Sequence, residues 1–152
     1  MYNVITHIFS AELVAVGGIS SIKSEKLQND IWSDIEDPPV DGTNMYYYAV
    51  VVHDSSHYYF GGYSDGDTNS ILRLQSGSWT WTNAGQLNSV RRGHGVIVVN
   101  DTFMVVGGRG DYKNEACVLN NNQFNCTELS SSLNNYGFDP ILFSVADNYG
   151  NC

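Results

Sequence analysis

Short apolar runs alternate along the chain with clusters of glycine, asparagine, aspartate and serine. Three of the apolar runs end in a glycine pair, and the first glycines of these pairs are residues 17, 61 and 107, so the spacings are 44 and 46 residues. Short apolar runs bounded by turn-forming residues are typical of β-strands. Recurrence at a nearly constant spacing is typical of a repeat architecture. The pattern therefore predicts an all-β repeat protein.

Each period contains further apolar runs that are joined by short turns rich in asparagine, aspartate, serine or glycine. Two such runs around a short turn form a β-hairpin, so each period predicts four antiparallel strands, which is one propeller blade. The strands expected in the second and third periods are 47–52, 58–60, 71–74, 78–82, 96–99, 103–106, 116–119 and 123–127. The segment 24–31 is the only candidate helix, and it is short.

The period resembles the kelch repeat. Arg91-Arg92-Gly93-His94 matches the Arg-x-Gly-His opening of that repeat, and Trp81 followed by Leu87 matches the tryptophan and leucine that close it. The resemblance covers nearly the whole chain, although Phe124 stands where a tryptophan is usual, the second unit lacks the arginine, and the last strands of the first unit look merged or short. It implies blades at 2–37, 44–87 and 91–131, with 138–152 as the first strand of a further blade.

Three blades and a strand are fewer than the roughly four to eight blades of a closed propeller. An open arc exposes apolar blade faces and sheet edges, which favours self-association. We therefore expect a partial propeller. It is a piece of a longer propeller, one part of a ring that a second chain completes, or an arc that is stable alone.

A partner-binding face is expected where the longer loops gather. The connections after the second and fourth strands of each blade emerge on one face, and binding residues concentrate on such loops. These loops are 19–28, 63–69, 109–114, 38–45, 83–93 and 129–138. In proteins that this chain resembles, the same loops bind the partner. The residues predicted to bind are Tyr63, Asp65, Asp67, Arg91, Arg92, Arg109, Asp111 and Tyr112.

Other distinctive residues have structural interpretations. Glycine pairs fit places where blades crowd or φ is positive, and Trp79 and Trp81 are expected on one face of a strand, with at least one packed between blades. Arg91 and His94 open a repeat, and an alternative role for them is to bind neighbouring backbone. The residues predicted to be structural are Gly17, Gly18, Gly61, Gly62, Gly107, Gly108 and Trp81.

The sequence predicts no metal site and no cofactor. Residues 65–69 are rich in oxygen ligands but lack the full spacing and terminal glutamate of a calcium loop. His53 and His57 lack the cysteine or carboxylate partners that would complete a zinc site.

Cys117 and Cys126 flank Asn121-Asn122 symmetrically. A two-residue turn at these asparagines places the two cysteines opposite each other in a non-hydrogen-bonded pair, where a cross-strand disulfide forms. The alternative is two reduced thiols in a cytosolic protein. A disulfide, with glycosylation sequons at Asn100 and Asn125, favours an extracellular or secretory location over the cytoplasm.

The net charge of −9 argues against nucleic acid as a ligand. No apolar stretch is long enough to span a membrane. The most consistent function is a non-catalytic scaffold that binds another protein through its loop face. Alternatives are an oxidase or sugar-processing enzyme, as in some similar propellers, or a substrate-recruiting propeller of a ubiquitin-ligase adaptor.

Overall fold

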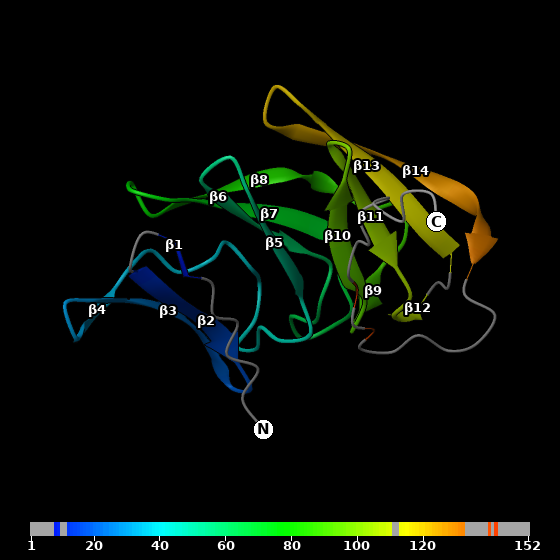
Figure 1. Cartoon of the computed structure of the whole chain (residues 1–152). Helices are drawn as coiled ribbons and strands as arrows, with labels where there is room; N and C mark the ends of the chain where they lie inside the picture. Colours follow the sequence, from blue (N-terminus) through cyan, green and yellow to red (C-terminus); the bar gives the residue numbers. More distant parts are fainter. Residues whose placement is uncertain (1–7, 10–11, 111–112, 133–139, 141, 143–152) are drawn as a thin grey trace, which may run out of the picture.

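Three antiparallel sheets of four strands follow one another along the chain (Figure 1). The computed structural model describes residues 8–9, 12–110, 113–132, 140 and 142. Its strands are β1 (Ile8–Phe9), β2 (Glu12–Gly18), β3 (Ser21–Gln28), β4 (Ile31–Asp34), β5 (Ala49–His53), β6 (Ser56–Phe60), β7 (Ser70–Gln75), β8 (Thr80–Gln86), β9 (Arg91–Arg92), β10 (Gly95–Val99), β11 (Thr102–Val106), β12 (Arg109–Gly110), β13 (Lys113–Asn120) and β14 (Gln123–Ser132). None of these residues forms a helix long and apolar enough to cross a membrane.

The sheets are β1–β4, β5–β8 and β10-β11-β13-β14, and the short strands β9 and β12 pair separately. Neighbours in each four-stranded sheet are antiparallel and follow chain order, apart from the insertion of β12. The predicted all-β class of four-stranded antiparallel sheets is thus confirmed, and the three sheets are called the first, second and third blade below.

The first blade corrects two expectations. Residues 24–31 are not helical, and the last two strands are not merged, although β4 is short at four residues: β3 and β4 form a hairpin around Asn29 and Asp30. Both turn residues have positive φ, 51° and 62°. Two consecutive residues in this conformation form the hairpin turn that matches strand twist, and asparagine and aspartate tolerate it well. This local turn chemistry outweighs the weak helical pattern.

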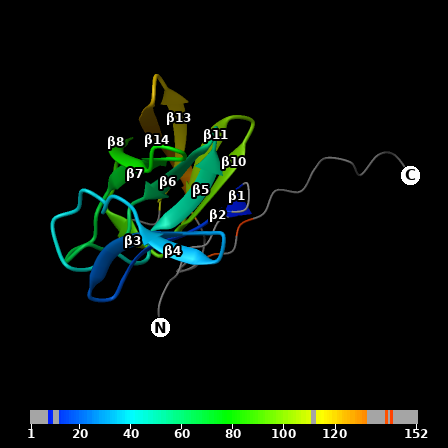
Figure 2. The ribbon, with the colours of Figure 1, turned by 90° about the vertical axis from the view of Figure 1, so that its left-hand side faces the viewer.

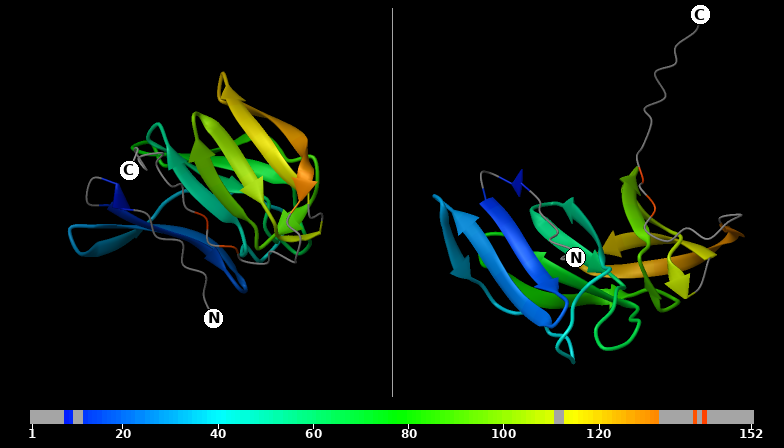
Figure 3. Two further views of the ribbon diagram at one scale, coloured as in Figure 1. Left: turned by 45° about the vertical axis from the view of Figure 1, so that its right-hand side comes forward. Right: turned by 90° about the horizontal axis from the view of Figure 1, so that it is seen from below.

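The second blade is packed on both faces, because its side chains alternate between its two neighbours. Tyr59 faces the first blade, in one apolar cluster with Val14 and Val16 of β2, and its ring lies 4.9 Å from that of Trp81 on β8 of its own blade. Phe60 faces the third blade, where its ring lies 5.1 Å from that of Phe124 in the other cluster. Figures 2 and 3 show the resulting curved row of sheets.

Trp79 differs from its expected place on the same strand as Trp81. It precedes β8, in a turn at φ 56°, although both tryptophans are buried in the cluster between the first and second blades. The prediction that 138–152 begins a further blade lies almost wholly outside the described residues. The two residues described there, Pro140 and Leu142, lie against Gly95.

The glycine pairs lie where one blade meets the segment that leads into the next. We call residues 44–48 and 90–94 the leading segments of the second and third blades. The Gly18 amide donates to the Met45 carbonyl at 2.7 Å, and the Gly62 amide donates to the Arg91 carbonyl at 2.8 Å. A Cβ atom on Gly62 would lie 2.2 Å from the Tyr48 ring. Tyr48 belongs to the leading segment of the same blade, so that segment excludes any side chain at Gly62.

We expect Gly62→Ala to lower the free energy of unfolding by about 2–4 kcal/mol, because it combines a backbone at φ 97° with a clash against a buried ring. Gly77→Ala is the control for backbone strain alone, since Gly77 has φ 88° but no atom near its Cβ position. Urea denaturation checks both. Equal losses in the two variants would show that the close approach contributes nothing.

Candidate functional site

The connections that follow the second strand of each blade gather at one end of the sheets, with the leading segments beside them. Tyr46 and Tyr63 exchange backbone hydrogen bonds of 3.2 and 2.9 Å. One repeat later, Arg92 in β9 pairs with Arg109 in β12. The same backbone arrangement is thus built twice, once with two tyrosines and once with two arginines. We call this end the loop face.

Four expected loops are shorter than predicted. In 109–114, β12 covers Arg109–Gly110 and β13 begins at Lys113. Residues 19–28 are mostly strand β3, so only a two-residue turn follows β2. In 83–93, β8 continues to Gln86 and β9 begins at Arg91. In 129–138, β14 continues to Ser132, and the residues from 133 lie outside the described part. The loop 63–69 is present as predicted.

Tyr46, Tyr63 and Arg92 form a three-layer stack, which we call the tyrosine–arginine stack. The tyrosine rings are 4.9 Å apart and nearly parallel, at 25°. The Arg92 guanidinium lies 5.0 Å from the Tyr63 centroid and forms an ion pair of 3.2 Å with Asp67. All of these side chains are half-buried. Aromatic and cation–π contacts of this kind hold a guanidinium in a defined position.

Asp65 also belongs to this loop, but its carboxylate binds other residues of the chain. Its carboxylate accepts a hydrogen bond from the Thr43 amide at 2.9 Å and another from the Asn44 side chain. The hydrogen bond from Asn44, and then that from Thr43, lowers the pKa of Asp65. Since Asp67 is paired with Arg92, both aspartates of 65–69 are engaged by protein groups. The carboxylates of this segment therefore stabilise the loop itself.

A cleft of about 280 Å³ opens beside the stack, between residues 39–41 and the second blade. Asp67 lines it together with Tyr48 and Ser64. The cleft is therefore a concave, mainly polar extension of the loop face.

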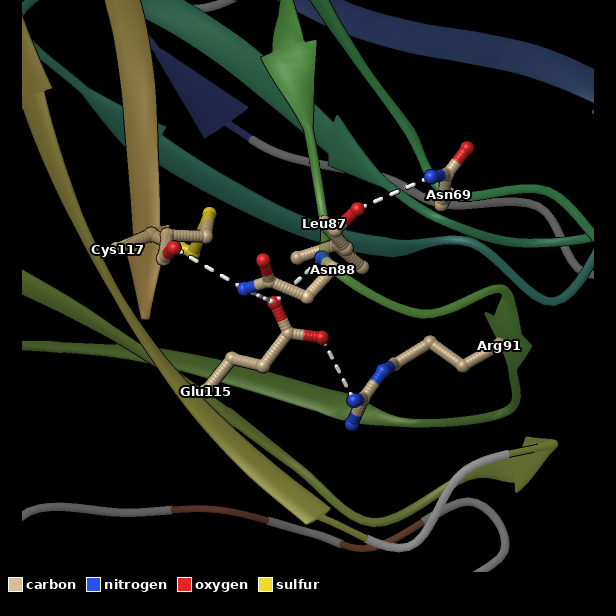
Figure 4. Close-up of a disulfide and its surroundings, with 7 residues drawn as sticks. Asn69, Leu87, Asn88, Arg91, Glu115 and Cys117 are labelled. Carbon is tan, nitrogen blue, oxygen red and sulfur yellow. Dashed lines mark hydrogen bonds and ion pairs between the residues drawn. A yellow bond between two sulfur atoms is a disulfide. The ribbon is translucent and has the colours of Figure 1, made fainter. Parts of the chain in front are cut away.

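Arg91 is not on the surface, which corrects its assignment as a partner-binding residue. Its side chain is fully buried and forms an ion pair with the equally buried Glu115 at 2.7 Å (Figure 4). Its guanidinium also donates to the Gly107 carbonyl at 3.2 Å. Asn88 donates two hydrogen bonds to the Glu115 carboxylate, one from its backbone amide at 2.8 Å and one from its side-chain amide at 3.0 Å. The alternative role of binding neighbouring backbone describes Arg91 better.

His94 is the second buried polar residue of this leading segment. A Cβ on Gly61 would lie 2.7 Å from its ring, and one on Gly108 would lie 2.8 Å from its Cβ, so it is enclosed by two glycine pairs. Burial, and secondly the charge of Arg91, lowers the pKa of His94 to about 3. His94 is therefore neutral in the folded protein at neutral pH.

The structure brings most of the other predicted site residues together. Tyr63, Asp67 and Arg92 come together in one cluster, and Arg109 is exposed beside Arg92. Asp111 and Tyr112 lie outside the described residues. Sequence reasoning missed Tyr46, although Tyr46 precedes Arg92 by 46 residues, the spacing of one repeat.

The cysteines are paired in the register expected from the Asn121-Asn122 turn. Cys117 lies opposite Cys126, and their Sγ atoms are 2.06 Å apart. Asn88 links this pair to the buried ion pair, because its side-chain amide also donates to the Cys126 carbonyl at 3.0 Å. Glu115 and the two cysteines form the one cluster of metal-ligating side chains that occurs among the described residues.

Replacing one member of the buried ion pair leaves an uncompensated buried charge. We expect Arg91→Ala to lower the free energy of unfolding by about 3–5 kcal/mol. The double variant Arg91→Ala/Glu115→Ala should lose clearly less than the sum of the two single variants, because neither charge is left alone. Arg109→Ala is the exposed control and should unfold like the parent chain. Additive losses would contradict a direct ion pair.

Acidification should destabilise the chain through His94. In the unfolded state His94 has the ordinary histidine pKa of 6.5. In the folded state it takes up a proton only near pH 3. Stability is therefore complete above about pH 6.5 and is lost as the pH falls. Between pH 7 and 5 the loss should be about 2 kcal/mol larger in the parent chain than in His94→Gln. Denaturation curves at both pH values test this, and parallel losses would refute it.

Comparisons with known proteins bear on the fold. Residues 44–88 match the family model of the Kelch motif. No curated protein matches the sequence closely enough to count as a relative. Among solved structures, YjhT is similar with a TM-score of 0.72 and 13% identity, over 87% of this chain and 52% of that chain. The chain thus spans about half the length of YjhT, and this likeness concerns the fold alone. With the repeated four-stranded blades, these matches show that residues 44–88 carry a Kelch motif and that the chain folds as part of a kelch-type β-propeller.

Proposed function

We propose that the chain is a non-catalytic scaffold that binds a segment of another protein through its loop face. The Kelch motif supports protein interaction in general. The observation that carries the proposal is the tyrosine–arginine stack, in which aromatic and arginine side chains are presented half-buried on a braced backbone. Tyrosine and arginine are among the residue types that contribute most binding energy at protein interfaces.

The backbone beneath the stack supports binding because it is already ordered. The Tyr46–Tyr63 backbone bridge and the Arg92–Asp67 ion pair hold the side chains in place before a partner arrives. Side chains that are already fixed lose less conformational entropy on binding, so more of the contact energy remains as affinity.

The charges of this region favour an acidic residue in the partner segment. Arg109 is exposed beside Arg92, and the two belong to paired strands. Guanidinium groups bind carboxylates with two parallel hydrogen bonds. The neighbouring cleft of about 280 Å³ can take a polar side chain next to that carboxylate. The expected ligand is therefore an extended segment with a carboxylate flanked by a residue that packs on Tyr63.

Selection of displayed random peptides on the immobilised 152-residue chain tests this proposal. We expect the enriched peptides to share an acidic residue. Tyr63→Ala and Arg92→Ala should each weaken binding of a synthetic peptide by about thirtyfold or more, as measured by calorimetry, because hot-spot residues contribute about 2 kcal/mol or more.

Ile31→Ala is the matched control, because Ile31 is 68% exposed but follows a hairpin turn at the opposite end of the first blade. Its affinity for the peptide should equal that of the parent chain. Peptides that bind all three variants equally, or that lose affinity only with Ile31→Ala, would place the binding surface elsewhere and overturn the proposal.

A further inference from the structure

Glu115, Cys117 and Cys126 bring three metal-ligating atoms within 4.8 Å of one another. Glu115 and Cys117 are two residues apart on β13, so their side chains leave the same face of the strand. Cys126 lies directly across from Cys117 on β14. Figure 4 shows Asn88 next to both Glu115 and Cys117, and its side-chain amide donates to the Glu115 carboxylate and to the Cys126 carbonyl.

We propose that, when the disulfide is reduced, the thiolates of Cys117 and Cys126 and the carboxylate of Glu115 bind a zinc ion. This site is independent of the proposed loop-face function. In the disulfide form the two sulfurs carry no negative charge and are poor ligands for zinc. Reduction makes them available as thiolates, which are the form of cysteine that binds metal.

The reduction is a thiol–disulfide exchange with a dithiol reductant. A reductant thiolate attacks Cys126 Sγ, because Cys126 is partly exposed whereas Cys117 is fully buried. The Sγ–Sγ bond breaks and Cys117 leaves as a thiolate. The second thiol of the reductant then attacks the mixed disulfide, releases Cys126 and closes the reductant into its own disulfide. Two electrons pass to the protein, and zinc then replaces the protons of the two thiols.

The charges of the neighbourhood suit a divalent ion. Burying an ion costs free energy unless opposite charge accompanies it. Two thiolates neutralise one zinc ion, and Glu115 is already neutralised by Arg91 at 2.7 Å. The loaded cluster therefore carries no net charge. This neutrality suits its surroundings, because Glu115 and Arg91 are fully buried. A zinc ion without the thiolates would leave an excess of positive charge beside Arg91.

The ligand set identifies zinc by its chemistry. Zinc accepts thiolate sulfur and carboxylate oxygen in one tetrahedral shell, with bonds of about 2.3 Å and about 2.0–2.2 Å respectively. Harder ions such as calcium and magnesium require oxygen ligands alone. Three protein ligands leave the fourth position to water, and the partly exposed Cys126 marks the side from which the ion arrives.

The experiment uses cobalt(II) as a spectroscopic substitute for zinc in the chain carrying Cys152→Ser, so that Cys117 and Cys126 are its only thiols. The chain is reduced with a dithiol, desalted without oxygen and titrated. We expect one cobalt per chain, with thiolate-to-cobalt charge-transfer absorption that zinc abolishes. The oxidised chain should give no such absorption. Its absence from the reduced chain would overturn the proposal.

Two further variants test the ligands. Cys126→Ser keeps the buried ion pair and should lose the charge-transfer absorption at stoichiometric cobalt, and unchanged absorption would refute a two-thiolate site. Glu115→Gln should weaken zinc affinity by at least about tenfold, since even changes to groups behind the ligands cost about that much. X-ray absorption of the zinc-loaded parent chain tests the mixed ligand shell without a ligand variant. Two sulfurs with lighter atoms support the site, and a shell of sulfur alone overturns it.

Discussion

The fold depends on the close passage of each leading segment over the glycine pair of the preceding blade. A Cβ atom on Gly61 would lie 2.6 Å from the Arg91 carbonyl oxygen, and the same carbonyl accepts the Gly62 amide. Because this contact is made by backbone, it fixes the path of the chain whatever the surface side chains are. The pairing of Tyr46 with Tyr63, and of Arg92 with Arg109, follows from that path. The loop face is therefore a consequence of the blade contact.

The buried ion pair extends the same contact into the third blade. Arg91 belongs to a leading segment, and its guanidinium reaches Glu115 on β13 and the Gly107 carbonyl. Asn88 joins this pair to the strand that carries Cys126. Neighbouring residues of one segment thus differ in their surroundings. Arg91 is buried in the ion pair, and Arg92 lies at the loop face beside Tyr63.

Local patterns predict much of this architecture, and long-range contacts account for what they miss. Glycine spacing indicates the blades, and two asparagines are enough to place Cys117 opposite Cys126, because turn geometry sets the register. The hairpin at Asn29-Asp30 was missed because its polar strand resembles a short helix. The burial of Arg91 depends on Glu115, 24 residues away, and no local spacing reveals that pairing. Tyr46 is recoverable only by aligning the repeats.

The second blade is enclosed by neighbours on both faces, whereas the first and third each share one described face with it. A substitution there meets two apolar clusters at once, so fewer alternatives are tolerated at each position. The match to the Kelch motif, at residues 44–88, coincides with this enclosed blade. Sequence drift is thus expected to be slowest where a blade is enclosed on both sides.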